Sequence, residues 1–157
     1  MPIFATAGAK LFIGGALNGP LVTEASFTGI TWVEVKRLET LGAIGDTSEP
    51  VTFYDIGEAR RIKLKGVRDA GTMEVVAGID YSDAGQEDVL EAEASPNSFA
   101  FKIQFNDAPV GGTPSLRLFV AHVLSASEQL DTASSVMKLN MSLGVNSNVV
   151  RVAAEEA

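Results

Sequence analysis

The chain of 157 residues contains no cysteine and only one histidine, His122. Without cysteine it has no disulfide framework, no thiol nucleophile and no cysteine-bound zinc. One histidine is too few for a multi-histidine metal centre, and the sequence contains no G-x-S-x-G, P-loop or H-E-x-x-H motif. We therefore predict a protein that is not an enzyme, that uses no cofactor or metal, and in which His122 has a structural role.

Basic residues are also scarce, with 12 Lys and Arg against 20 Asp and Glu and a formal charge of −8. This balance argues against tight, non-specific binding of DNA or RNA, which relies on clustered cations. No apolar run approaches the ~20 residues that span a bilayer, and the first residues lack the basic start of a signal peptide. We expect a protein that is made or assembled inside a cell and inserts into no membrane.

What is abundant is alternation of apolar and polar residues. This pattern predicts strands with one buried face. The clear cases are residues 61–65, 73–79, 99–105 and 136–143, and the weaker ones are residues 11–13, 32–38, 51–56 and 149–152. The chain has the usual length of one domain. We predict a mainly β fold, a β-sandwich or barrel-like domain over residues 1–157.

Residues 115–125 differ because they are apolar on both faces. Leu118 and Val120 lie on one face of the expected strand, and Phe119 and Ala121 lie on the other. Such a strand must be covered on both sides. The protein's own core can cover one face, and we expect a helix or another subunit to cover the second.

One short α-helix is expected over residues 84–94. Asp83 is a suitable N-cap, with Gln86 at the third helical position as in a capping box. Glu87 lies in the first turn, where the helix dipole favours negative charge. Pro96 ends the helix.

Residues 41–59 read as a long irregular inter-strand loop, in which residues 51–56 can form an extended arm. Glycine, aspartate, serine and proline in this stretch favour turns. A loop of this length inside a compact domain is usually either functional or disordered.

Charge is unevenly distributed along the chain. No basic residue lies between Arg68 and Lys102, and a candidate acidic surface there comprises Asp83, Glu87, Asp88 and Glu91. A solvated face is the simplest explanation, and a surface that repels a polyanion or meets a basic partner is the alternative. A basic stripe, the candidate subunit contact, comprises Arg61, Lys63 and Lys65. It lacks the interleaved aromatics of nucleic-acid sites. We favour pairing between copies of the chain.

The order of these patterns resembles the tail tube (major tail) proteins of bacteriophages with long, non-contractile tails, the lambda-type family. The similar segments are residues 8–14 (GAKLFIG), 60–73 (RRIKLKGVRDAGTM), 85–90 (GQEDVL), 99–105 (FAFKIQF), 119–125 (FVAHVLS) and 136–143. The resemblance covers nearly the whole chain as a succession of short patterns. Ala157 leaves no room for the C-terminal immunoglobulin-like domain of some relatives.

The resemblance implies a structural virion protein. Subunits of that family form hexameric rings in which sheets join into one barrel, and the rings stack into a tube around a tape measure protein. Initiator and terminator proteins lie at the two ends of the tube. The genome DNA later passes through the tube and is not tightly bound by it. The resemblance places the protein in the virion tail, after assembly in the host cytoplasm.

In that family the long loop reaches an adjacent ring. The resemblance therefore assigns an inter-ring role to Gly45, Asp46, Thr47, Ser48, Glu49, Pro50 and Tyr54. We expect this loop to be mobile in the monomer and ordered in the tube. Two alternatives stay open, a tube protein of a contractile tail or secretion apparatus and a non-enzymatic β-sandwich binding or decoration module.

Overall fold

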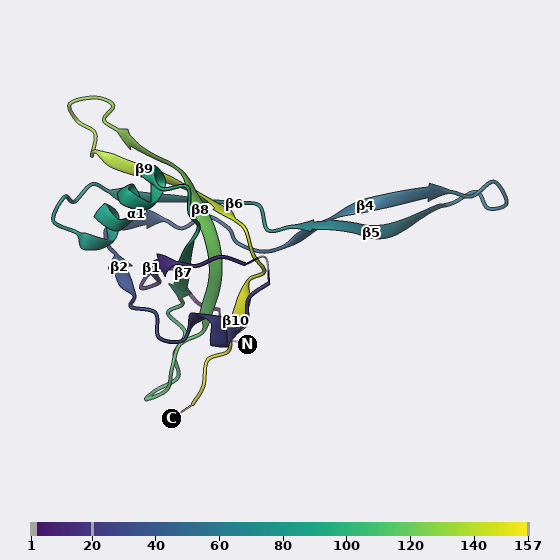
Figure 1. The fold of residues 1–157 in the computed structure, drawn as a ribbon, viewed down its shortest axis with the longest axis horizontal. Helices are drawn as coiled ribbons and strands as arrows, with labels where there is room; N and C mark the ends of the chain where they lie inside the picture. Colours follow the sequence, from purple (N-terminus) through teal and green to yellow (C-terminus); the bar gives the residue numbers. More distant parts are fainter. Residues whose placement is uncertain (1–2, 20, 157) are drawn as a thin grey trace.

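The computed structural model describes residues 3–19 and 21–156, which form a curved antiparallel sheet, one α-helix and a projecting two-stranded ribbon (Figure 1). The strands of the eight-stranded sheet are β1 (Lys10–Ala16), β2 (Val33–Val35), β3 (Leu38–Thr40), β6 (Thr72–Gly78), β7 (Phe99–Gln104), β8 (Leu116–Gln129), β9 (Lys138–Val145) and β10 (Val150–Val152). The prediction of a mainly β fold with one α-helix is confirmed.

The sheet curls so that its two ends meet at one corner of the chain. Its strand order is β2-β1-β7-β8-β9-β6-β3, with β10 paired to β8. The terminal strands β2 and β3 follow one another in sequence, separated only by Lys36 and Arg37. Arg37 has a positive φ of 64°, which a non-glycine residue adopts only in a tight bend. We call Lys36 and Arg37 the corner; there the chain passes from one edge of the sheet to the other.

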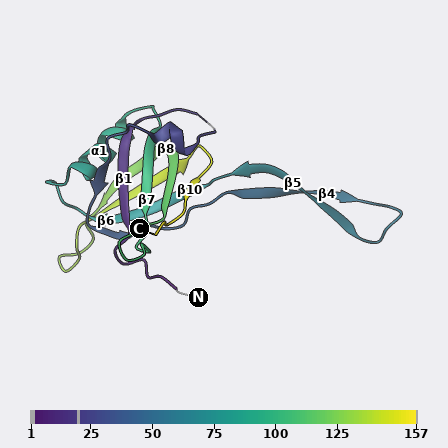
Figure 2. The same ribbon diagram turned by 90° about the horizontal axis from the view of Figure 1, so that it is seen from below.

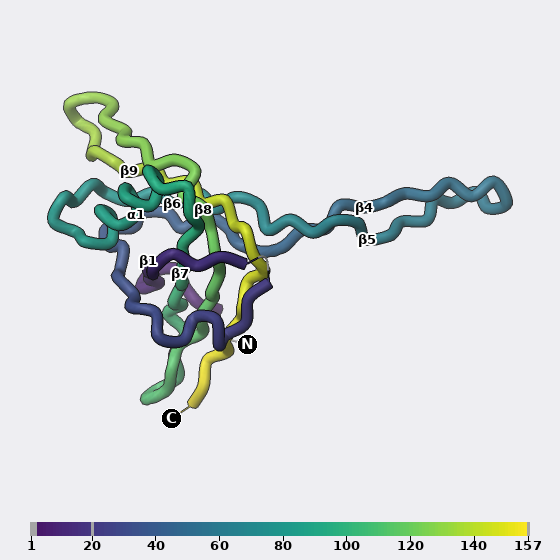
Figure 3. The backbone as a smooth tube through the Cα atoms, viewed as in Figure 1, coloured from purple at the N-terminus to yellow at the C-terminus, as the bar shows by residue number. Residues whose placement is uncertain are grey.

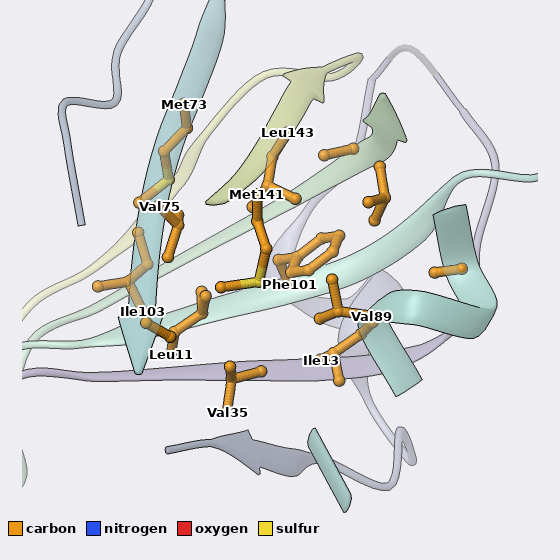
Figure 4. Close-up of a cluster of buried hydrophobic side chains, with 14 of the residues drawn as sticks. Leu11, Ile13, Val35, Met73, Val75, Val89, Phe101, Ile103, Met141 and Leu143 are labelled. Carbon is orange, nitrogen blue, oxygen red and sulfur yellow. The ribbon is translucent and has the colours of Figure 1, made fainter. Parts of the chain in front are cut away.

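The core fills the inside of this curve. Phe101 and Phe119 are fully buried and stack with their ring centroids 5.7 Å apart. Alternate residues of β1, β6 and β9 pack around them, among them Leu11, Val75 and Met141 (Figure 4). The predicted alternation is confirmed in β6 and β9, whereas β7 also buries Ala100 on its other face, in the second cluster.

The second apolar face of β8 is covered by the protein itself. Leu118 and Val120 pack in a separate cluster with Val22 and Phe27, and β10 adds further apolar side chains. Phe27 ends a single turn of 3-10 helix, Glu24–Phe27. We expected a helix or another subunit to cover this face; the segment before β2, which includes the 3-10 turn, covers it instead. Leu124, farther along β8, is 58% exposed.

The predicted helix is confirmed as α1 (Ala84–Ala94), and its start is hydrogen-bonded to the corner. The Asp83 carboxylate accepts hydrogen bonds from the backbone N–H groups of Lys36 (2.9 Å) and Gln86 (3.3 Å). The Gln86 amide donates to the carbonyls of Lys36 (3.0 Å) and Gly78 (2.8 Å), and accepts from the N–H of Asp80 (3.0 Å). Gln86 therefore ties the helix to the sheet instead of completing a capping box.

The helix also lies very close to β2. A Cβ atom at Gly85 would overlap the carbonyl oxygen of Glu34, so only glycine allows this approach. No helix in the described part of the chain is long and apolar enough to cross a membrane.

The projecting ribbon consists of β4 (Thr47–Tyr54) and β5 (Arg61–Asp69), which pair only with each other. We call it the arm. Residues 41–59 are thus not one irregular loop, since the extended part begins at Thr47 and ends before Ile56. The predicted buried face of residues 61–65 is also wrong, because Ile62 is 40% and Leu64 is 59% exposed. No described segment packs alongside the arm (Figure 3).

The hydrogen bonds of Gln86 generate a prediction about stability. Gln86→Leu removes the side-chain partner of three part-buried backbone groups, so we expect the free energy of unfolding to fall by about 3 kcal/mol. Urea denaturation measures this change. The control Glu93→Leu, at an exposed position of the same helix, should change it by less than about 0.5 kcal/mol. Equal effects of the two substitutions would contradict the role given to Gln86.

Candidate assembly surfaces

The register of the arm separates its side chains into two different faces. Val51 lies opposite Leu64 and Phe53 lies opposite Ile62. Because cross-strand partners point to the same side of a ribbon, these four form one face, the apolar face. The other side, the basic face, carries Thr52, Tyr54, Arg61, Lys63 and Lys65.

The apolar face is exposed to water in the monomer. Val51 is 52%, Phe53 is 58% and Leu64 is 59% exposed. An isolated two-stranded ribbon is marginally stable in water, and monomers rarely expose contiguous apolar surface without a partner. The apolar face is therefore a candidate contact surface.

The arm is anchored at its base. Leu41 and Ile44, just before β4, pack against the main core. Arg68 and Asp46 form an exposed ion pair of 2.8 Å, which contributes little by itself. The Thr47 hydroxyl donates to the carbonyl of Asp69 at 3.1 Å. The far end has no such support, and its turn is held by the Asp55 carboxylate accepting from the N–H of Gly57 at 2.8 Å.

The structure places the predicted inter-ring residues at two different parts of the arm. Gly45 and Asp46 precede β4, and residues 47–50 form the part of β4 nearest the body. Tyr54 lies at the far end, where the Arg61 guanidinium stands 5.8 Å from the centre of its ring. Sequence reasoning did not single out Phe53 or Ile62, although their alternation with polar neighbours was visible.

The three cations of the basic stripe lie where the alternation predicts. Arg61, Lys63 and Lys65 are all exposed and share one face of β5. Their direct neighbours across the ribbon are Tyr54, Thr52 and Pro50, respectively. The basic face thus presents three cations without a carboxylate from β4 opposite them.

The candidate acidic surface is smaller than predicted. Glu87 and Glu91 are exposed on α1, and Asp88 is half-buried. Asp83 is only 7% exposed because its carboxylate is used at the corner, so it does not belong to this surface. The acidic face is therefore Glu87, Asp88 and Glu91.

Perturbed pKa values in the described residues have local structural causes. Hydrogen bonds from Ser115 lower the pKa of Asp107, and hydrogen bonds from Ser82 lower that of Asp80. Loss of hydration lowers the pKa of Lys102, whose ammonium lies 4.4 Å from the ring centre of Phe12. These groups form no acid–base pair in a cleft.

His122 lies on β8 with its Nε2 atom 3.4 Å from the side-chain nitrogen of Asn146. This geometry suits a structural histidine. Among residues 3–19 and 21–156, no group of three or more His, Cys, Asp or Glu side chains is placed to hold a metal ion. The extended surfaces of the arm and of α1 are the candidate functional sites.

Neither a protein family model nor a curated protein sequence matches the chain. Solved structures do match. A chain of the SPP1 tail tube is 14% identical with a TM-score of 0.65, covering 96% of this chain and 80% of its own. A chain of the anti-feeding prophage baseplate is 15% identical with a TM-score of 0.65, covering 98% of each chain. A chain of the anti-feeding prophage tube-terminating cap is 12% identical with a TM-score of 0.69, covering 98% of this chain and 93% of its own.

These likenesses show a shared fold. The fold spans nearly the whole described chain, and it occurs in chains of both a phage tail tube and contractile injection assemblies. The similarity in sequence is low, as expected where a β architecture is kept while its surface residues change.

Independence of the arm from the core can be tested in the monomer. Phe53→Ser removes an exposed side chain, so we expect the free energy of unfolding to change by no more than about 0.5 kcal/mol. Phe101→Ala, a matched substitution at a fully buried phenylalanine, should lower it by about 3 to 5 kcal/mol. Urea denaturation at low protein concentration compares them. A large loss in Phe53→Ser would mean that the apolar face is packed in the monomer.

Proposed function

We propose that the chain is a structural tube subunit that forms hexameric rings, and that these rings stack around a channel for genome delivery. The observation that carries the proposal is the uncovered apolar face of the arm on a fold shared with tube chains. An exposed apolar ribbon needs a partner, and a second copy of the chain is the partner that a tube supplies.

The geometry of the arm favours an open assembly. The arm projects from one side of the body, while α1 lies on the opposite side (Figures 1 and 2). A contact between an arm and a different surface of the next copy is head-to-tail, and such contacts repeat into rings or filaments. In this proposal the arm, including residues 45–50 and Tyr54, links adjacent rings.

The tail type is a finer part of the proposal. The succession of sequence patterns favours a long, non-contractile tail of the lambda type. The matches to chains of the anti-feeding prophage and of an extracellular contractile injection system favour the second candidate, a tube inside a contractile sheath. Binding to a sheath protein would distinguish the two.

The acidic charge suits a channel for DNA. A ring of six carries six times −8, or −48, before counterions. DNA carries about one negative charge per 1.7 Å of its axis, so a channel of the same sign lacks contacts that would grip it. Only charges within about 8 Å of the channel wall act at physiological salt.

The remaining partners follow from the tube. We propose that residues 1–157 act as one tail-tube domain and that the tube encloses a tape measure protein. Initiator and terminator proteins would lie at the two ends of the tube. The protein would act in the virion tail after assembly in the host cytoplasm, with no catalytic activity and no membrane insertion.

A sugar-binding module is less well supported. Trp32 stacks on Phe27, with ring centroids 6.3 Å apart, and packs against the second cluster, so its ring does not offer a free platform for a sugar.

Electron microscopy tests the proposed function directly. Negative-stain images of the concentrated protein should show rings or hollow tubes. The double variant Phe53→Ser and Ile62→Ser should stay folded and monomeric, because it loses the apolar face. The control Thr52→Ala, on the opposite face of the arm, should assemble as the wild type does. Monomers of the wild type at all concentrations would overturn the proposal.

Hydrogen exchange tests the ordering of the arm on assembly. Amides of β4 and β5 should exchange at least tenfold more slowly in the tube than in the monomer, because assembly covers a ribbon that is marginal alone. Amides of β7, which lies inside the sheet, provide the control and should exchange alike in both states. Equal protection of the arm before and after assembly would contradict its role as an inter-ring link.

A further inference from the structure

A groove runs between α1 and the end of β1, and we call it the helix groove. Its volume is about 750 Å³. One wall is the helix, with Asp88, Glu91 and Ala92, and the other consists of the Gly14–Gly15 stretch of β1 and the loop before β2. The groove thus combines an apolar floor with two carboxylates on its helical side.

The groove is open because β1 loses its neighbour there. Pairing between β1 and β2 ends at Ile13 and Val33, and the pairing of β1 with β7 shifts register between Ile13 and Ala16. A Cβ placed at Gly15 would meet no atom within 4 Å, whereas one at Gly14 would meet the side chains of Ile30 and Trp32, so the wall is open at Gly15. An extended segment can therefore approach the strand closely.

The negative charge of the helix groove indicates what kind of segment can bind there. Asp88 and Glu91 line the groove, Glu87 is exposed on the same helix, and the described lining contains no lysine or arginine. A ligand with an apolar side and a cationic edge satisfies both the floor and the carboxylates.

The arm has these properties. Its apolar face matches the apolar floor, and all three cations of its basic face come from the same strand, β5. Long lysine side chains can cover apolar surface while their ammonium groups reach the rim. Lys63 and Lys65 start on the face opposite the apolar face, so with β5 beside α1 their long side chains would have to extend past the edge of the ribbon to reach Asp88 and Glu91.

The occupant must come from another copy. The arm points away from the side of the body that carries α1 in both perpendicular views (Figures 1 and 2).

Two other hollows on the surface are less suitable than the helix groove as the site that receives the arm. The one along the arm itself is lined by Lys63, Lys65 and Arg68 as well as by Asp46 and Glu49, and Asp46 is already paired with Arg68. Another, beside Phe4, has a single carboxylate, Asp107, that already accepts two hydrogen bonds from Ser115.

We propose that the arm of one subunit lies in the helix groove of a second copy, with its apolar face on the groove floor and β5 beside α1. This inference rests on the proposed tube function and names the receiving surface that the function requires. Gly15, Asp88 and Glu91 thereby become contact residues of the assembly.

Disulfide cross-linking tests the contact between the arm and the helix groove. Because the natural chain has no cysteine, only the introduced thiols can form disulfides. The variant Phe53→Cys with Gly15→Cys places one thiol on the apolar face and one on the groove wall. Mild oxidation of the assembled protein should give a ladder of covalent oligomers on a non-reducing gel. The control Thr52→Cys with Gly15→Cys, with a thiol on the basic face instead, should give at least fivefold less.

Charge exchange tests the same contact by another route. Lys63→Glu with Lys65→Glu should raise the protein concentration needed for assembly at least tenfold, and so should Asp88→Lys with Glu91→Lys. Combining the four substitutions should restore most of the loss, because the pairs attract again with reversed signs. The control Glu93→Lys, on α1 but outside the groove lining, should leave assembly within twofold of the wild type.

The outcomes separate this contact from the tube itself. Tubes without the cross-linked ladder and without rescue by charge exchange would overturn the docking site and leave the proposed function standing. Covalent oligomers without rings or tubes would support the docking site and overturn the tube. Monomers that neither cross-link nor assemble would overturn both.

Discussion

The hydrogen bonds at the corner are the constraint on which the rest of the structure depends. Lys36 and Arg37 carry the chain from one edge of the sheet to the other, and Asp83 and Gln86 hold this corner to the start of α1. Because the corner joins both ends of the sheet, the sheet must curl around its core. Because α1 is held there, it packs on β2 and leaves a groove beside the end of β1.

The body of the protein and the arm differ in how far their apolar and polar groups are covered or paired within the monomer. In the body, every described buried side-chain nitrogen or oxygen has a hydrogen-bond partner, and both faces of β8 are covered between Leu118 and Ala121 by the chain itself. In the arm, Phe53 and Leu64 remain exposed on a ribbon with no neighbour. The chain itself covers most of the apolar surface of the body, whereas it leaves the apolar face of the arm uncovered. The proposed role as a repeating subunit rests on this contrast.

Much of the local structure could be predicted from sequence. The bounds of α1 follow from Asp83 at its start and Pro96 after its end, and the strands of the core follow from alternation. The basic stripe was also placed correctly on one face of β5. Whether each apolar strand face is buried or exposed could not be predicted in the same way. Ile62 and Leu64 alternate as regularly as Leu139 and Met141, yet the first pair is exposed and the second is buried. Asp83 likewise reads as one of several surface acids until its carboxylate is seen bound to the corner.

The sequence by itself determined most strands of the core, where the helix begins, and how the charges separate into a basic ribbon and an acidic helix; it did not predict the turn between β2 and β3 or the start of β4 at Thr47. The properties that it determined depend on neighbours within a few positions, so they can be read along the chain. Only the tertiary structure decided which apolar faces are covered, where the two ends of the sheet meet, and that the arm and α1 lie on opposite sides of the body. Burial depends on what packs from distant parts of the chain, and a period of two residues is the same in a core strand and in a free ribbon.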